Sequence, residues 1–324
     1  AGRVDVVGGD GKAFVVHVHS SLSFASGRIA AYGGAVFHPQ KSNEGETNMK
    51  IAMCQMRVVY GDEDGNIARA QAYIRRAAEQ GADLALLPET LDLGWANPDA
   101  ARLAEPIPGP RSQALADAAR RAGILVCAGL TERCEDKVYN AAVLLDERGE
   151  LLLLHRKINL LTEVEGPCYC VGDRLGVAQT RFGALGVTIC ADNSSSSLVL
   201  AESLCRMGAQ IVLSPCAWAV PPDCARAYYG AEWYGPYARL AKLYQVPTVG
   251  VSNVGAVPAG AWAGWSCIGS SIALFPDGVS GATLPYGKNA ECLRVLDVPL
   301  RGEAPYGTAL SAEVERRRRA LTEA

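Results

Sequence analysis

From Met49 onward, short apolar stretches typical of β-strands alternate with longer segments that have the hydrophobic period of an α-helix. Residues 51–59 and 84–87 have the composition of strands, and residues 66–80 between them form a helical pattern closed by Gly81. A chain built of such units buries its sheets beneath helices. The alternation therefore predicts an α/β fold.

The same unit recurs further along the chain. Pro110 suits the first position of a helix that ends before Gly123, and residues 124–130 follow as a strand. Residues 198–207 and 211–214 repeat the helix and the strand. The other predicted strands are 141–145 with 151–156, 176–180 with 184–189 (each pair a hairpin), 248–252, and 270–275 and 291–298 around the Pro276-Asp277-Gly278 turn.

The two ends of the chain do not follow this pattern. Residues 1–48, here called the leader, contain eight glycines and three of the four histidines. We expect the leader to lie outside the core fold, with a short added hairpin as the alternative. Residues 49–300 form the predicted core domain. Residues 301–324 form a tail whose short helix is expected to be capped by Ser311 and to carry the solvated basic run Arg316–Arg319.

Composition narrows the classes of partner. The chain has 31 basic and 34 acidic residues, which gives no electrostatic reason to expect nucleic acid or an anionic membrane surface. No apolar run reaches the roughly 20 residues of a membrane helix, so we expect a cytoplasmic protein. The eleven cysteines include no Cys-x-x-Cys pair and fall mostly within strand or helix patterns, which favours reduced thiols without a structural metal.

Three predicted strands end in polar residues that the strands do not need. Glu89 follows one, Lys157 another, and Cys190 a third. A thiol nucleophile, a carboxylate that takes its proton and a lysine that stabilises an oxyanion form a plausible catalytic set. Structural alternatives remain open for each: a loop cap for Glu89, a snorkelling side chain for Lys157 and a buried core cysteine for Cys190. His155 is expected on the surface of its hairpin.

The segment around Cys190 has the pattern of a strand, a sharp turn and the start of a helix. Residues 185–189 are small or apolar, and four serines follow Asn193 before a helical pattern begins. A cysteine in such a place lies near backbone N–H groups and the positive end of a helix dipole. We therefore expect its environment to favour the thiolate.

These residues resemble the nitrilase, or carbon–nitrogen hydrolase, superfamily over residues 49–298. The motifs are Leu-Pro-Glu89, Arg156-Lys157 and Ile189-Cys190-Ala-Asp192, in the family's order. Glu165 resembles the family's second glutamate, and the segment 252–255 its late Asn-x-x-Gly segment. The resemblance implies a four-layer α-β-β-α sandwich that assembles as a homodimer or a larger homo-oligomer.

The sequence departs from the family pattern just after the cysteine. Asp192 is kept, but Ser196 and Ser197 stand where many amidase branches have Pro-Glu. True nitrilases typically have Trp-Glu directly after the cysteine, whereas this chain has Ala191-Asp192. We therefore favour an amide or N-carbamoyl substrate over a nitrile.

The resemblance also implies a mechanism without metal or cofactor. Glu89 accepts the proton of Cys190, Lys157 and the backbone N–H of Ala191 hold the oxyanion, and Glu165 orients the lysine or the substrate. A small-molecule amide or carbamoyl compound would be hydrolysed through a thioester. The alternatives are a nitrilase, an acyltransferase that uses an amine acceptor, and a non-catalytic metabolite-binding or scaffold protein.

Candidate substrate contacts are less specific. Ala191 and Asp192 follow the nucleophile directly, and the aromatic residues Trp95 and Trp218 lie on loops near the predicted site. Core packing is an equally good interpretation of both tryptophans. The same holds for two further aromatic residues, Tyr228 and Trp233. Arg174 or Arg226 could pair with a substrate carboxylate, but a position on the exposed surface is the better interpretation of both.

Overall fold

The computed structural model describes residues 2–7, 13–18, 48–224, 230–279 and 281–323. The chain divides into two compact units, Ala1–Glu44 and Gly45–Ala324. In the first unit, strand β1 (Gly2–Val7) pairs antiparallel with β2 (Ala13–Val18). This pairing corresponds to the short added hairpin that the sequence analysis kept as an alternative.

The second unit contains two six-stranded sheets. In the first sheet the order is β17-β3-β4-β5-β6-β7, and β3, β4 and β5 are parallel. Its other three strands run antiparallel to their neighbours. The bounds are β3 (Asn48–Gln55), β4 (Leu84–Leu86), β5 (Leu125–Cys134), β6 (Lys137–Leu145), β7 (Leu151–Arg156) and β17 (Cys292–Pro299).

The second sheet has a matching plan. Its order is β16-β15-β12-β10-β9-β8, with β9, β10 and β12 parallel and antiparallel strands on both sides. A small sheet of order β11-β14-β13 is formed by strands that lie between β10 and β15 in the chain. The bounds are β8 (Val177–Thr180), β9 (Gly183–Val187), β10 (Ile211–Cys216), β11 (Ala219–Val220), β12 (Thr248–Ser252), β13 (Val254–Ala256), β14 (Ser266–Ile268), β15 (Ile272–Leu274) and β16 (Gly281–Thr283).

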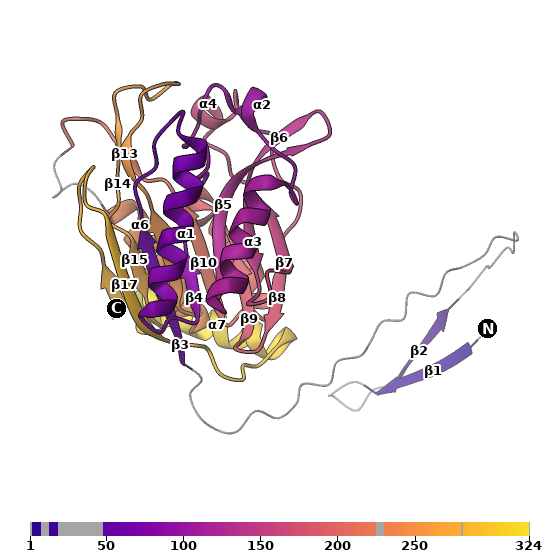
Figure 1. Cartoon of the computed structure of the whole chain (residues 1–324). Helices are drawn as coiled ribbons and strands as arrows, with labels where there is room; N and C mark the ends of the chain where they lie inside the picture. Colours follow the sequence, from indigo (N-terminus) through magenta and orange to yellow (C-terminus); the bar gives the residue numbers. More distant parts are fainter. Residues whose placement is uncertain (1, 8–12, 19–47, 225–229, 280, 324) are drawn as a thin grey trace, which may run out of the picture. The chain divides into compact units, whose positions relative to one another are not determined.

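Alternation along the strands places these sheets face to face. Ile51 and Met53 of β3 share a buried cluster with Leu213 of β10, whereas their neighbours Ala52 and Cys54 pack on the opposite face. That opposite face is covered by α1 and α3, which lie side by side over the sheet (Figure 1). The helices are α1 (Glu63–Glu79), α2 (Ala100–Leu103), α3 (Pro110–Ala122), α4 (Thr162–Glu165), α5 (Val199–Arg206), α6 (Ala231–Tyr244), α7 (Gly307–Glu323) and the 3₁₀ turn η1 (Cys190–Asn193).

Helices α5, α6 and α7 cover the second sheet. Val212 of β10 shares a cluster with Ala201 of α5, Leu240 of α6 and Leu310 of α7. Each large aliphatic side chain buried in such a cluster stabilises the fold by about 1.5 to 3 kcal/mol. The four layers are therefore α-β-β-α, and the predicted sandwich is confirmed.

The closing strands were predicted correctly as strands, but one detail of the tail was wrong. The strand predicted over 291–298 is β17 (Cys292–Pro299), which pairs with β3 in the first sheet, whereas β15 belongs to the second sheet. The tail helix begins at Gly307, and Ser311 donates to the Gly307 carbonyl from within the helix instead of capping it. Pairing with a strand about 240 residues away leaves no local signal in the sequence.

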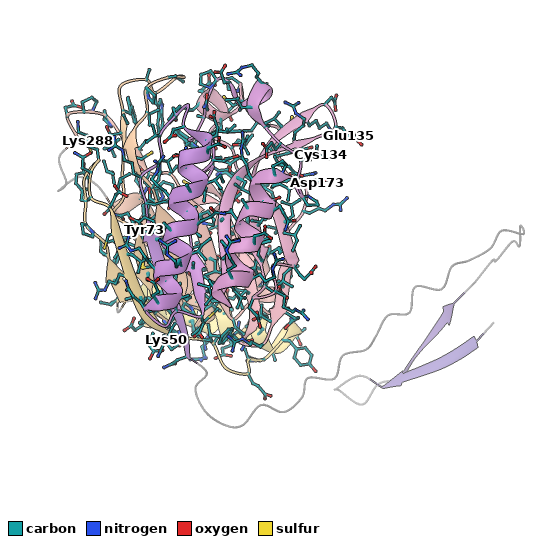
Figure 2. The ribbon with its side chains drawn as sticks, in the orientation of Figure 1. Lys50, Tyr73, Cys134, Glu135, Asp173 and Lys288 are labelled. Carbon is teal, nitrogen blue, oxygen red and sulfur yellow. The ribbon has the colours of Figure 1, made fainter. Side chains whose placement is uncertain are left out.

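Strand β5 extends beyond its predicted end at residue 130 and forms a hairpin with β6. Cys134 pairs with Lys137 across a two-residue turn in which Glu135 has a φ of 55°. Cys134 and Glu135 are labelled in Figure 2. The turn Glu135-Asp136 lacks the glycine that marks most two-residue hairpin turns, so this pairing was not predicted. Among the described residues, no helix is both long and apolar enough to span a membrane.

Candidate active site

Glu89 lies just past the end of β4 and is fully buried. Its N–H donates to the carbonyl of Cys216 (3.2 Å), and its Oε1 accepts from Asn140 (2.6 Å) and Lys157 (2.8 Å). The backbone can pass here because Gly129 of β5 has no side chain: a Cβ there would lie 2.4 Å from the Cα of Glu89. The other carboxylate oxygen, Oε2, has no hydrogen-bond partner among the described residues.

Lys157 follows β7 and is 1% exposed. Its Nζ donates to Oε1 of Glu89 and to both carboxylate oxygens of Glu165, each at 2.8 Å. Burial by itself would lower the pKa of this amine, but the two carboxylates outweigh burial and hold its pKa well above the usual range. The lysine is therefore a fixed positive charge.

Glu165, at the end of α4, connects the lysine to the surrounding structure. Besides Lys157, its carboxylate accepts hydrogen bonds from Asn140 (3.0 Å), the indole of Trp95 (3.0 Å) and the N–H of Leu161 (2.9 Å). Asn140 thus bridges Glu89 and Glu165. Asn140 was not predicted, because a single amide directly before the apolar run 141–145 has no local feature that marks it as a site residue.

Cys190 stands at the turn after β9 with a φ of 43°, a conformation that non-glycine residues rarely adopt. Its N–H donates to the hydroxyl of Ser214 (3.1 Å). Burial raises the pKa of the Cys190 thiol well above its usual range, with Cys216 and Glu89 acting in the same direction and Lys157 opposing them. The expectation of a favoured thiolate was wrong, because the cost of desolvating the charge exceeds the help from the lysine.

The pKa of Glu89 also departs from its usual range. Burial, reinforced by the charge of Glu165, raises the pKa of Glu89 to about 7, although Lys157 and Asn140 act in the opposite direction. A carboxylate with such a pKa can take up and release a proton near neutral pH. Glu89, Lys157, Glu165 and Cys190 lie close enough for their charges to affect one another, so the structure brings the four predicted residues together.

Asp192 was expected to contact the substrate, but the structure places its carboxylate in a buried hydrogen-bond network. It is fully buried, and its oxygens accept from the N–H groups of Ile158 (3.1 Å), Asn159 (2.8 Å) and Ile189 (2.9 Å). Its Oδ2 also lies 2.8 Å from Nε2 of His155, which is 1% exposed. The expectation that His155 lies on the surface was wrong, because its partner lies 37 residues along the chain. Asp192 therefore connects the segment after β7 to the turn that carries Cys190.

The serines after the cysteine have two functions in the structure. Ser197 is buried, and its hydroxyl donates to the carbonyls of Ala191 (2.6 Å) and Asp192 (3.1 Å). Asn159 adds a bond to the same Ala191 carbonyl (2.7 Å). Ser196 instead lines a cavity, so the Ser-Ser pair holds the turn and leaves a small wall beside the thiol.

That cavity has a volume of about 870 Å³ and opens onto Cys190 and Ala191. Trp95 and Trp218 lie in its wall and are also 2% exposed, so the pocket and core interpretations of these residues are compatible. Arg174 is exposed and does not line it. Arg226 and Tyr228 lie outside the described residues. Within the described part of the chain, no cluster of side chains is suited to hold a metal ion.

Comparisons with known proteins identify relatives of the chain. The chain is 30% identical to the omega-amidase NIT2 of Danio rerio over 181 residues, which is 53% of this chain and 64% of the relative. It is 33% identical to a nitrilase of Pyrococcus abyssi over 179 residues, 53% of this chain and 66% of the relative. The matched segments thus span slightly less than two thirds of these relatives.

The fold is also found in solved structures. An alanine mutant of the Nesterenkonia AN1 amidase, a nitrilase-superfamily protein, superposes with a TM-score of 0.69 at 22% identity, covering 86% of this chain and 97% of that one. The family model for carbon–nitrogen hydrolases matches residues 50–303. Because this match includes most of the chain, the protein belongs to the carbon–nitrogen hydrolase family.

Proposed function

We propose that the protein is a cysteine-dependent hydrolase of a small-molecule amide or N-carbamoyl compound that works through a thioester. The observation that supports this most is that a buried thiol, Cys190, and a buried carboxylate, Glu89, lie close enough for their charges to interact. Cys190 is a thiol whose raised pKa makes a base necessary. Glu89 presents a carboxylate oxygen that has no hydrogen-bond partner in the described part of the chain, and burial raises its pKa to about 7. Lys157 supplies a fixed charge beside both.

Acylation uses this arrangement directly. The carboxylate of Glu89 takes the thiol proton as the sulfur of Cys190 attacks the carbonyl carbon. Negative charge develops on the carbonyl oxygen, where Lys157 and the backbone N–H of Ala191 stabilise it. The carbon–nitrogen bond then breaks, and Glu89 returns the proton to the leaving nitrogen, which departs as ammonia or an amine.

Deacylation repeats the same steps with water. Glu89 accepts a proton from the water molecule that attacks the thioester, and the carbon–sulfur bond breaks. The proton returns to the sulfur of Cys190, which restores the resting enzyme. Glu165 keeps Lys157 in place through its two bonds.

The test is ammonia release by Cys190→Ala, with Cys205→Ala as the matched control. Cys205 is also fully buried, but it lies in α5 within the helical cluster. Loss of the nucleophile should reduce kcat/KM at least about a thousandfold, while Cys205→Ala should stay within about threefold of wild type. Both variants should keep the wild-type circular dichroism spectrum. A Cys190→Ala enzyme within about tenfold of wild type would remove Cys190 from the nucleophile role.

The same assay addresses the alternatives. Because one relative is a nitrilase, the substrates should include nitriles, and we expect ammonia from amides or carbamoyl compounds in preference. Turnover of nitriles alone would indicate a nitrilase. A folded protein without any turnover would favour a binding or scaffold role.

We also propose a homo-oligomer located in the cytoplasm, as the family resemblance and the composition suggest. Two apolar side chains near helix α5 are consistent with an interface between subunits. Val199, at the start of the helix, is 63% exposed, and Met207, just after its end, is 52% exposed. Sedimentation velocity of the full chain measures the assembly. A monomer at micromolar concentration would contradict the oligomer.

A further inference from the structure

Every tryptophan of the chain lies in the wall of the cavity at Cys190. The sequence contains five, and they come from four separate segments between β4 and β14. Two pairs are stacked: Trp262 with Trp265 at 4.0 Å between ring centroids, and Trp218 with Trp233 at 5.2 Å. The fifth, Trp95, lies 5.1 Å from Trp262. We call this space the tryptophan cavity.

The charges in the wall have one sign. Among the described residues that line the tryptophan cavity, the charged ones are Glu163 and Glu232, and none is lysine, arginine or histidine. A substrate carboxylate in the tryptophan cavity would therefore lose water and meet two like charges, Glu163 and Glu232. A neutral aromatic group would instead gain stacking and apolar burial.

We propose that the tryptophan cavity receives the acyl part of a neutral aromatic amide and selects against amides that carry a second carboxylate. This inference rests on the proposed amide hydrolysis. The cavity volume of about 870 Å³ suits a small molecule of this kind. Trp95 connects the wall to the catalytic residues, because its indole donates to Glu165 at 3.0 Å.

The first test compares amides that differ in their distal group. We expect 3-phenylpropanamide to be hydrolysed with the highest kcat/KM, hexanamide with an intermediate value, and the monoamide of adipic acid with a value at least about tenfold below hexanamide. Hexanamide and the adipic monoamide are matched in chain length, so their ratio isolates the effect of the carboxylate. Faster hydrolysis of the carboxylated amide would overturn the inference.

The second test measures binding without turnover. Since all five tryptophans line the tryptophan cavity, intrinsic tryptophan fluorescence of the Cys190→Ala protein reports its occupancy. Titration with 3-phenylpropanamide should give a saturable change, and the adipic monoamide should bind at least about tenfold more weakly. Equal binding of the two, or tighter binding of the carboxylated amide, would contradict the proposal.

Two variants locate the preference. Trp262→Ala should lower the kcat/KM ratio of 3-phenylpropanamide to propanamide about tenfold, mostly through a higher KM for the aromatic amide. Its control is Tyr306→Ala, which removes an aromatic ring that is 87% exposed and does not line the cavity. Tyr306→Ala should leave the ratio unchanged.

The charge is tested by reversal. Glu232→Lys places a cation in the wall, so it should raise the kcat/KM ratio of the adipic monoamide to hexanamide at least about threefold. An unchanged ratio would overturn the role given to the acidic wall. The exposed Glu79 of α1 provides the matched control, Glu79→Lys, which should not change the ratio.

Failure of this inference differs from failure of the proposed function. If Cys190-dependent ammonia release occurs but carboxylated amides are the better substrates, only the inference is wrong. If no amide is hydrolysed, the proposed function is wrong, and the fluorescence titration still decides whether the tryptophan cavity prefers neutral aromatic amides.

Discussion

Glu89 is the residue whose titration should be visible in the activity. Burial raises its pKa to about 7, and only the deprotonated carboxylate can accept the thiol proton. We therefore expect kcat/KM to rise about tenfold per pH unit below pH 7 and to level off above it. Initial rates of ammonia release between pH 5.5 and 9 measure this profile.

Substitution separates Glu89 from other groups that titrate. Glu89→Gln should lose at least about a thousandfold in kcat/KM, and its residual activity should lack the rise near pH 7. Glu79→Gln, a change to an exposed carboxylate on α1, should retain the wild-type profile. If Glu89→Gln kept the rise, another group would be the base.

Three of the candidate site residues could be predicted from the sequence for a local reason. Glu89, Lys157 and Cys190 each follow an apolar strand, and the end of such a strand can be recognised from neighbouring residues alone. The raised pKa of Cys190 could not be recognised in this way, because it results from burial beneath other segments. Asn140 lies within a strand, where only its partners distinguish it from an ordinary polar residue.

At the scale of elements, Asp192 connects η1 to the segment that follows β7. Burial would raise its pKa, but the bonds from His155 and from backbone N–H groups outweigh burial and hold the pKa below its usual range. Asp192→Asn replaces one accepting oxygen with a donor. We expect a loss of about 1 to 3 kcal/mol in the free energy of unfolding, measured in urea at pH 7.

The pH dependence of this loss has a definite sign. Because the folded-state pKa of Asp192 is depressed, its stabilisation is present above the unfolded pKa of about 4 and disappears as the pH falls through the folded value. The difference between wild type and Asp192→Asn should therefore shrink in acid. Asp99→Asn, which alters an exposed pair with Arg102, should change stability by less than about 0.5 kcal/mol. Equal stabilities of wild type and Asp192→Asn at pH 7 would refute the connecting role.

The ends of helices could be predicted from the sequence better than the ends of strands. The helix predicted over 110–122 is α3 with the same bounds, because Pro110 and Gly123 mark its ends. The strand predicted to end at residue 130 continues to Cys134, because its pairing with β6 satisfies the backbone beyond the apolar run. Local residues mark a helix end, whereas a strand ends where its partner does.

At the scale of the whole molecule, we predict that the catalytic unit does not need the leader. If residues 1–48 are not needed by the catalytic unit, a chain that starts at Met49 should keep its melting temperature within about 2 °C and its kcat/KM within about twofold. The cut removes only the Asn48–Pro299 position from the pairing of β3 with β17. Calorimetry and ammonia release measure the two quantities.

The matched control is a cut at the other end of the same unit. Removing residues 307–323 deletes α7, whose Leu310 and Val314 are buried against α5 and α6. This loss should lower the melting temperature by more than about 5 °C. A similar loss for the chain that starts at Met49 would show that the leader packs on the fold or completes the assembly.

The sequence by itself determined the alternation of strands and helices and the strand ends that carry Glu89, Lys157 and Cys190, because these patterns are set by residues within about ten positions of one another. The tertiary structure decided which strands pair, that His155 meets Asp192, and that five tryptophans enclose one cavity without a described cation in its wall. These contacts join residues that are far apart in the chain, and their energies depend on burial, which only packing creates.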